Sequence, residues 1–360
     1  MKNKLLVIVL AGLGLLILPF IAQQFGNAWV RIIDIALLYV LLALGLNIVV
    51  GYAGLLDLGY VAFYAVGAYM FGLLASSQLW EQFPAVAAMF PNGLHAPLWI
   101  VIPAAAFIAG VAGVLLGAPT LRLRGDYLAI VTLGFGEIIR VFLNNLDHPV
   151  NITNGPKGIG PIDGMHVFGF EMSKRHELFG YDVPPVVNYY FLFLVLVLAS
   201  VLICYRLERS RIGRAWMAIR EDEIAAKAMG INTRNMKLLA FGMGATFGGV
   251  AGVMFAGYQS FITPEAFSLQ ESIMIVAMVV LGGIGHIPGV IVGAVLLAAL
   301  PEVLRYVAGP LQAATDGRLD ASILRQLLIA TAMIVIMLLR PRGLWPSPEH
   351  GKAAPTPASK

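Results

Sequence analysis

The sequence predicts an all-α, polytopic membrane protein. Of its 360 residues, 59% are hydrophobic and 12% are charged, whereas soluble domains carry about 45–50% apolar and about 25% charged residues. A soluble chain of this length could not cover its surface with so few charges. Most of the 39 glycines lie inside the apolar runs, where small residues let membrane helices approach one another closely. We therefore expect a bundle of closely packed helices in a bilayer.

Apolar runs of about 17–23 residues, the length that crosses a bilayer as a helix, indicate about ten transmembrane helices. The first run, near 4–22, follows Lys2 and Lys4 and precedes no small-residue cleavage site, so we expect an uncleaved helix rather than a signal peptide. The others lie near 30–50, 58–77, 97–118, 126–143, 187–205, 237–257, 269–284, 287–306 and 322–340. The third, eighth and ninth of these helices have the least distinct bounds, because glycines and short connectors interrupt the apolar runs.

The basic residues predict the orientation, because lysine and arginine concentrate in cytosolic loops. With ten helices, every basic cluster falls on one side of the membrane: Lys2 and Lys4, Arg122 and Arg124, the run from Arg206 to Lys237, and Arg340 with Arg342. Both termini should therefore be cytosolic, and the loops near 78–96 and 144–186 should face outward. Residues 341–360 are polar and rich in proline, so we expect a disordered cytosolic tail.

No pattern for catalysis or for nucleotide binding is present. The chain contains no Gly-x-x-x-x-Gly-Lys-[Ser/Thr] loop, zinc-binding helix or Gly-x-Ser-x-Gly turn. A single cysteine, Cys204, excludes a disulfide framework and a metal–thiolate cluster. The net charge of +4 resides in a few loops that set the orientation and does not indicate nucleic-acid binding. We expect no enzymatic activity, no cofactor, no metal and no nucleic-acid partner.

Few ionisable residues lie inside the predicted helices, where such residues are often functional. Arg31 and Asp34 are three residues apart, so we expect a local ion pair near the membrane interface. Asp57 lies in the glycine-broken stretch Gly51–Gly59. Two interpretations of Asp57 stay open: a helix N-cap at the membrane surface, or part of a non-helical segment beside a route through the membrane.

Glu137 and Arg140 form a second candidate pair. Glu137 lies about 16 Å along the helix from Asp126, which places it past the middle of the bilayer. Their spacing allows an ion pair on one helix face, and the pair is either structural or lines a route through the membrane. No predicted helix carries the dense series of Asp, Glu and His that a proton relay would need.

The segment from Ser210 to Lys237 is polar and cationic although it lies between long apolar runs. Its pattern predicts two short helices joined by a turn, with Ser210 or Gly213 at the start, Gly230 as a C-terminal cap and Asn232 or Thr233 capping the next helix. An apolar stripe is expected at Trp216, Ile219 and Ile224. Such a compact unit suits docking to a cytosolic protein; the alternative is an amphipathic helix lying on lipid.

Within this segment, Glu223 to Gly230 resembles the EAA coupling loop of ABC importer permeases, whose pattern is Glu-Ala-Ala, three residues, then Gly. The chain keeps Ala225, Ala226 and Gly230, but Ile224 stands where the pattern has glutamate, and Glu223 lies one residue early. The resemblance implies that Glu223, Ala225, Ala226 and Gly230 belong to an ATPase-coupling loop at 210–237.

Four blocks, Gly125–Arg140, Thr153–Gly158, Gly51–Tyr69 and Gly282–Gly293, are similar to the LivM-type permease subunits of branched-chain amino acid ABC transporters. The resemblance covers roughly residues 30–340, which leaves residues 1–29 as an extra N-terminal helix. It implies a multi-pass protein of the bacterial inner membrane. Its implied partners are a LivH-type second permease, two ATPase subunits that bind the ATP, and a periplasmic amino-acid-binding protein. Leucine, isoleucine and valine are the implied cargo, although relatives carry other amino acids or urea.

An ion-coupled secondary amino-acid carrier is the alternative function. The small number of carboxylates inside the predicted helices argues against it. The sequence by itself determines neither the cargo nor the helices that contact a partner permease.

Overall fold

The computed structural model describes residues 2–314 apart from 91–93, 122, 124, 168 and 179–180, together with short pieces between 327 and 345. This part of the chain is mostly helical, as predicted. Its helices are α1 (Lys2–Gln24), α2 (Asn27–Asn47), α3 (Val61–Leu74), α4 (Gln78–Gln82), α5 (Pro84–Met89), α6 (Leu98–Thr120), α7 (Asp126–Asn145), α8 (Pro185–Glu208), α9 (Arg211–Glu221), α10 (Glu223–Ala228), α11 (Thr233–Gln259), α12 (Leu269–Gly282) and α13 (Ile287–Ala314).

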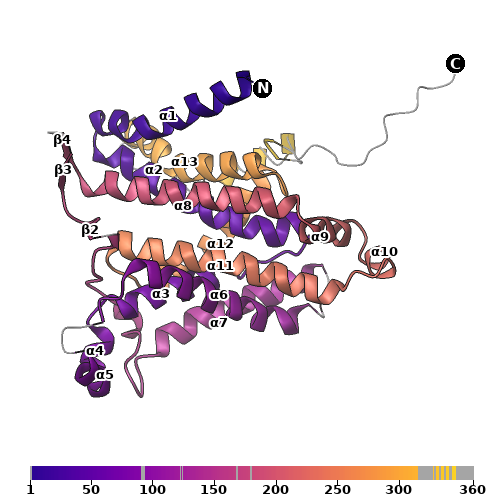
Figure 1. The fold of residues 1–360 in the computed structure, drawn as a ribbon, viewed down its shortest axis with the longest axis horizontal. Helices are drawn as coiled ribbons and strands as arrows, with labels where there is room; N and C mark the ends of the chain where they lie inside the picture. The colour runs from indigo at the N-terminus through magenta and orange to yellow at the C-terminus, as the bar shows by residue number, and fades with distance from the viewer. Residues whose placement is uncertain are drawn as a thin grey trace.

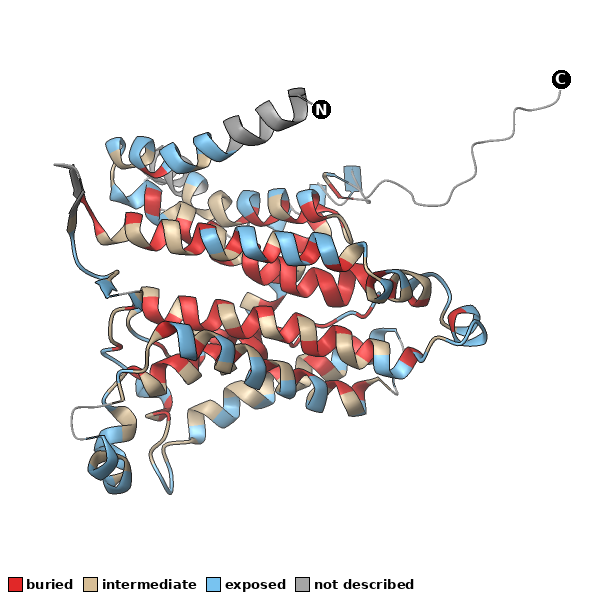
Figure 2. Ribbon diagram, viewed as in Figure 1, coloured by how far each residue is buried: buried red, intermediate tan, exposed pale blue. Residues whose placement is uncertain are grey.

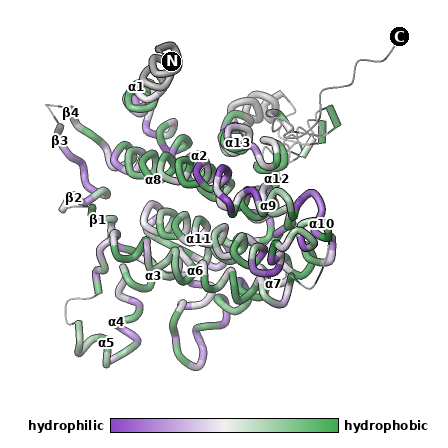
Figure 3. The backbone as a smooth tube through the Cα atoms, turned by 45° about the vertical axis from the view of Figure 1, so that its right-hand side comes forward, coloured by the Kyte–Doolittle hydropathy of each residue, from purple (hydrophilic) through white to green (hydrophobic). Residues whose placement is uncertain are grey.

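The long helices run side by side in two layers (Figure 1). One layer holds α1, α2, α8 and α13, and the other holds α3, α6, α7 and α11, with α12 between them. Helices α9 and α10 project from one end of the bundle, and α4 and α5 lie at the opposite end. Hydrophobic segments form the body of the bundle, and hydrophilic segments gather towards its two ends (Figure 3). This distribution is that of a membrane protein.

Four of the described helices are long and apolar enough to cross a membrane: Asn27–Tyr52, Leu98–Thr120, Pro185–Glu208 and Thr233–Gln259. Shorter apolar helices lie at Gly12–Gln24, Val61–Leu74, Leu269–Gly282 and Ile287–Val303. Helices α3 and α12 have 14 residues each, about 21 Å at 1.5 Å per residue, so neither alone spans a hydrocarbon core of about 30 Å. Most of the predicted helix 322–340 and the tail 341–360 lie outside the described residues, so the expected count of ten stays a prediction.

The predicted outward loop contains β-structure that the all-α prediction missed. Strand β1 (His166–Val167) pairs antiparallel with β2 (Phe170–Glu171), and β3 (His176–Leu178) pairs antiparallel with β4 (Tyr181–Val183). Strands of two or three residues are too short to show an alternating pattern, so the sequence carried no usable signal for them.

Helix α11 occupies the centre of the bundle because glycines let its neighbours approach its backbone. A Cβ atom on Gly67 of α3 would lie 1.9 Å from the backbone oxygen of Gly249 on α11. Gly244 of α11 likewise meets the backbone of Gly45 on α2. Membrane helices associate without a hydrophobic driving force. Close packing through small residues at such crossings stabilises the bundle instead. The buried residues accordingly line the facing sides of the two layers (Figure 2).

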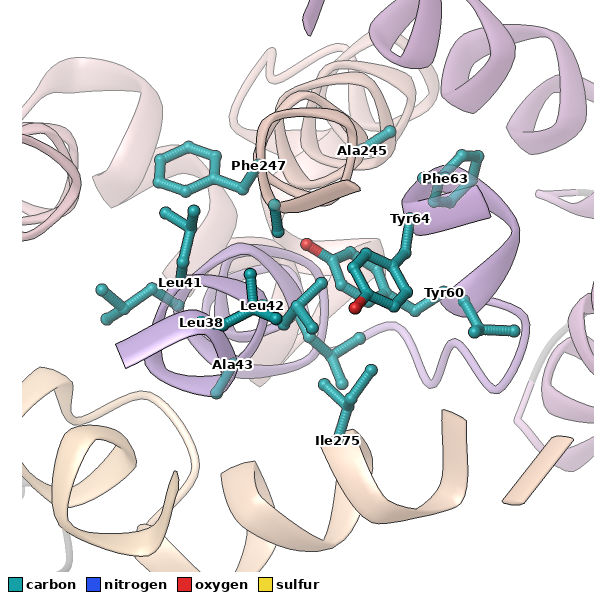
Figure 4. Packing of buried hydrophobic residues seen from close by; sticks show 14 of the residues in the cluster. Leu38, Leu41, Leu42, Ala43, Tyr60, Phe63, Tyr64, Ala245, Phe247 and Ile275 are labelled. Carbon is teal, nitrogen blue, oxygen red and sulfur yellow. The ribbon is translucent and has the colours of Figure 1, made fainter. Parts of the chain in front are cut away.

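Larger side chains fill the space around these crossings. Leu38, Leu41 and Leu42 of α2 pack against α11 and α3, with Phe247, Tyr60 and Tyr64 among their neighbours, and Ile275 of α12 approaches from the far side (Figure 4). The Tyr60 hydroxyl donates a hydrogen bond of 3.0 Å to the carbonyl of Gly244. The core therefore joins α2, α3, α11 and α12 into one packed unit.

The expected ion pair between Arg31 and Asp34 is wrong. Arg31 donates instead to Oε1 of Gln259 at 3.4 Å. Asp34 is fully buried, and neither of its carboxylate oxygens accepts a hydrogen bond. The reason is tertiary: the end of α11 lies against this face of α2, so Arg31 reaches across to α11 while Asp34 turns towards Tyr258 in the interior.

We expect Gly67→Ala to destabilise the bundle, because the added Cβ would overlap a backbone oxygen that no side-chain rotation can move. Overpacking of this kind costs about 1–3 kcal/mol. The measurement is the thermal unfolding midpoint of the purified protein in detergent. Gly14→Ala in α1 is the matched control, because nothing lies within 4 Å of its added Cβ and alanine favours a helix. Equal midpoints for the two variants would contradict the packing argument.

Candidate functional site

The helix that begins as α2 is broken inside the bundle. It continues as the π-helix η1 (Ile48–Tyr52), after which residues 53–59 are non-helical before α3 begins. We call residues 53–59 the helix break. The predicted glycine-broken stretch is therefore confirmed, whereas the π-helix was not predicted. Gly54 adopts φ of 68°, a left-handed conformation that glycine tolerates without strain, and this turns the chain out of the helix.

Asp57 lies in the helix break and is buried, so the interpretation as a surface N-cap is wrong. Its Oδ1 accepts a hydrogen bond of 2.9 Å from the backbone N–H of Gly59, two residues further on. Asp57 thus stabilises the turn locally. No hydrogen bond or ion pair joins it to Glu137 or Arg140, so these three candidates do not form one cluster.

Side chains from two other helices hold the backbone of the helix break. The N–H of Leu58 donates to Oγ1 of Thr132 on α7 at 3.0 Å, and the hydroxyl of Ser272 on α12 donates to the carbonyl of Leu58. Non-helical backbone at membrane depth is tolerated where protein satisfies its polar groups. Sequence reasoning missed both Thr132 and Ser272, because nothing in their local sequence indicates a tertiary partner.

A second break separates α11 from α12. Ser260 adopts φ of 56°, and Ile262 forms an isolated bridge with Ile159. The 3₁₀-helix η3 (Pro264–Phe267) then leads into α12. The bond from Ser272 to Leu58 links the helix after this break to the first break. Discontinuous helices that meet in this way build the substrate and ion sites of many transporters.

Glu137 and Arg140 form the predicted pair and extend it. Nε of Arg140 donates to Oε1 of Glu137 at 3.0 Å, and its Nη1 donates to Oε1 of Glu265 at 2.9 Å. Arg140 therefore ties α7 to η3, which the spacing within α7 could not reveal. Both carboxylates stay partly exposed, so the pair lies at the surface of this subunit rather than in its core.

The segment 210–237, which we call the coupling loop, forms the two predicted short helices. Ser210 caps α9 by accepting from the N–H of Gly213 at 3.1 Å, and Asn232 caps α11 by accepting from the N–H of Asn235 at 3.2 Å. Asp222, which the sequence reading did not assign as a cap, starts α10 by accepting from Ile224 and Ala225 at 2.8 and 3.0 Å. Gly230 turns the chain with φ of 84°, as a C-terminal cap should.

The predicted apolar stripe is only partly correct. Trp216 and Ile219 are buried, and the indole N–H of Trp216 donates to the carbonyl of Met236 at 2.7 Å. Ile224, in contrast, is 74% exposed. The chain turns at Asp222 before α10, so α10 projects away from the surface that buries α9 (Figure 1). Of the two alanines, Ala226 is buried and Ala225 is exposed.

Two charged contacts fasten the coupling loop to the bundle. Oε2 of Glu223 lies 2.7 Å from Nζ of Lys237 on α11, whose side chain is only 11% exposed. Arg220 at the end of α9 donates to the carbonyl of Gly51, the penultimate position of the π-helix before the break. The N–H of Gly285 nearby donates to Oδ1 of Asn47 at 2.9 Å. The coupling loop is therefore bonded directly to the backbone that precedes the helix break.

The comparisons with known proteins identify the family of the chain. The family model described as branched-chain amino acid transport system / permease component matches residues 29–338. The LivM permease protein of the high-affinity branched-chain amino acid transport system of Escherichia coli K12 is 40% identical, over 96% of this chain and 75% of its own. A probable LivM permease of Methanocaldococcus jannaschii is 26% identical over 86% of this chain and 90% of its own.

The LivH permease protein of Salmonella typhimurium is 25% identical over 93% of this chain and 98% of its own. No solved structure matches the chain. A family match over most of the chain, together with the 40% identity to the Escherichia coli protein, establishes the relationship. The chain belongs to the family of permease components of branched-chain amino acid transport systems.

Proposed function

We propose that this chain is a transmembrane permease subunit of an ATP-driven importer of leucine, isoleucine and valine in the bacterial inner membrane. In this proposal it forms the translocation pathway with a second, LivH-type permease. Two ATPase subunits bind the ATP, and a periplasmic binding protein delivers the amino acid. The single observation that carries the proposal is the bond from Arg220 of the coupling loop to the carbonyl of Gly51 beside the helix break. The names of the Escherichia coli and Salmonella relatives support the cargo.

The tip of the coupling loop suits docking to an ATPase subunit. Ile224, near the start of the short helix α10, is 74% exposed, and Met229, directly after its end, is 84% exposed. Large apolar side chains at a polar end of the bundle are favourable anchors for a partner protein. The small side chain of Ala225 leaves room for a partner beside these two residues, and Gly230 turns the chain towards α11. We assign these residues to the ATPase interface.

Two routes would carry a movement of this tip into the bundle. Through Arg220, α9 is bonded to the backbone of η1, and through Glu223 and Lys237, α10 is bonded to α11. Ala226 is buried, so α10 packs closely against the neighbouring helices at this residue. Because α11 is packed against its neighbours through glycine backbones, we expect it to move as a rigid body. The helix break, held by a few hydrogen bonds, is then the hinge.

The remaining sequence candidates receive supporting roles in this proposal. Asp57 stabilises the turn of the helix break, and the Arg140 bridge between Glu137 and Glu265 holds η3 against α7. Ten transmembrane helices with both termini in the cytosol, an extra N-terminal helix at 1–29 and a permease domain at 30–340 complete the arrangement. An ion-coupled carrier would need no loop built for a cytosolic partner, and the relatives named above are components of multi-protein transport systems.

Replacing the exposed tip should abolish assembly without unfolding the chain. We expect Ile224→Asp with Met229→Asp to lower retention of the ATPase subunits by at least about tenfold, because charges replace the apolar contacts of the interface. The measurement is co-purification of the ATPase subunits with the tagged chain from membranes.

The control is Phe170→Asp, which changes another exposed apolar side chain, on β2 at the opposite end of the bundle. It should leave ATPase retention unchanged. If the unaltered chain never retains an ATPase, even after crosslinking through Ala225, the proposed function is wrong.

Removing the Arg220 contact should uncouple transport from ATP hydrolysis. We expect Arg220→Ala to retain the ATPase subunits but to lower leucine uptake by about ten- to a hundredfold. The lost hydrogen bond involves a charged group, which contributes about 1.5–3 kcal/mol. Uptake of radiolabelled leucine and ATP hydrolysis are measured on the same proteoliposomes.

Arg214→Ala is the control on the same helix, because Arg214 is exposed and donates to the carbonyl of Arg209 rather than to the backbone beside the helix break. Its uptake should match that of the unaltered complex. Equal losses in the two variants would mean that general basicity of α9, rather than the contact with Gly51, matters for transport.

A further inference from the structure

We propose that this subunit itself binds the amino acid, in a cavity between α2, α3, α8, α11 and α12. The choice of an amino acid as ligand rests on the proposed function. The cavity measures about 240 Å³, and the side chains used below are Leu38, Tyr39, Phe193, Phe255, Gln259 and Glu271. Pockets for drug-sized ligands measure about 300–1,000 Å³, so this volume suits a smaller molecule.

A carboxylate marks one part of the cavity wall. Oε2 of Glu271 accepts a hydrogen bond of 2.9 Å from the Tyr39 hydroxyl, which fixes the carboxylate at the start of α12. No hydrogen bond within the described structure engages its other oxygen. An ionisable group at this depth in a membrane protein is a functional candidate. Glu271 is thus placed to accept a hydrogen bond from a primary ammonium group.

Aromatic rings in the cavity wall also suit an ammonium group. Tyr39 and Tyr64 line the cavity, and the faces of aromatic rings attract cations weakly.

A donor for the ligand carboxylate lies at another part of the wall. Oε1 of Gln259 accepts from Arg31 at 3.4 Å, which leaves the amide N–H groups of Gln259 as donors. The guanidinium of Arg31 adds a positive charge behind this amide. Glu271 and Gln259 therefore offer separate partners for the two charged ends of a zwitterion, and both line the same cavity.

The rest of the cavity is apolar and aromatic. Leu38, Phe193 and Phe255 line it, the ring of Phe255 lies 5.3 Å from that of Tyr64, and the ring of Phe193 lies 5.5 Å from that of Tyr258. Figure 4 shows Leu38 and Tyr64 coming from α2 and α3 within the same packed region. An aliphatic side chain is favoured here, because a charged one would have no partner.

The cavity lies directly beside the helix breaks. Glu271 precedes Ser272, whose hydroxyl donates to the carbonyl of Leu58 in the first break. Ala266, another lining residue, belongs to η3 in the second break. A ligand bound to Glu271 would therefore lie one residue along α12 from the contact with the element that we propose as the hinge.

The test measures equilibrium binding of radiolabelled leucine to the assembled complex in nanodiscs, without the periplasmic binding protein. We expect saturable binding. Glu271→Gln should raise the Kd by about ten- to a hundredfold, as for loss of a charge-assisted contact. Gln259→Leu should raise it by a smaller factor. Glu81→Gln, the same chemical change on α4 outside the cavity, should leave the Kd unchanged.

Ligand analogues separate the two ends of the zwitterion. Isoamylamine, which lacks the carboxylate, should compete with leucine for the unaltered complex, and its competition should be lost in Glu271→Gln. The fatty acid 4-methylpentanoate, which lacks the ammonium group, should not compete. Stronger competition by the fatty acid than by the amine would overturn the assignment of Glu271.

Glutamine keeps the shape of glutamate and can still accept a hydrogen bond from Tyr39, so the Glu271→Gln variant should fold. If that variant does not fold, Gln259→Leu provides a second test, because Gln259 is exposed. Absence of saturable leucine binding, or a Kd unchanged in both variants, would overturn the proposal. If ATP-driven uptake persists in that case, the proposed function stands and only the cavity assignment fails. Loss of ATPase association in the unaltered complex would instead refute the proposed function.

Discussion

The structure depends on how the largely buried backbone between Gly51 and Gly59 finds hydrogen-bond partners. Unpaired backbone groups are strongly unfavourable where water is absent. Thr132 of α7 and Ser272 of α12 satisfy Leu58, Asp57 satisfies Gly59, and Arg220 of α9 satisfies the carbonyl of Gly51 just before the break. One short segment thereby fixes the relative positions of three helices. Because Arg220 bonds to the carbonyl of Gly51, a movement of α9 relative to the bundle would act on this segment.

Close packing through glycine determines which parts can move independently. Helix α11 meets α2 and α3 backbone against backbone at Gly244 and Gly249. Interfaces this close cannot slide gradually, because shifting one helix brings Cα and carbonyl atoms into overlap. Local freedom is therefore concentrated in the two breaks, where a few side-chain hydrogen bonds replace a continuous helix. The cavity with Glu271 lies between the closely packed helices and the two breaks. The packed helices position a ligand there, and the breaks change conformation when it binds.

Several charged residues of this chain connect different elements. Arg31 reaches α11, Arg140 reaches η3 as well as Glu137, and Glu223 on α10 pairs with Lys237 on α11. Spacing along a helix predicts the i,i+3 neighbour as partner. That rule succeeded for Glu137 and Arg140 but failed for Arg31 and Asp34, since Arg31 reaches Gln259 on α11 while Asp34 is buried beside Tyr258. Each of these three contacts holds two elements together.

The sequence by itself determined the helical class, most helix positions, the glycine-rich break after α2 and the two short helices of the coupling loop. These features follow from hydropathy, capping residues and glycine, which act over a few residues of chain. The exposure of Ile224, the burial of Asp57 and the partners of Arg220, Thr132 and Ser272 were decided by tertiary structure alone. Each depends on which helix lies opposite, and that is set by the packing of residues far apart in the chain.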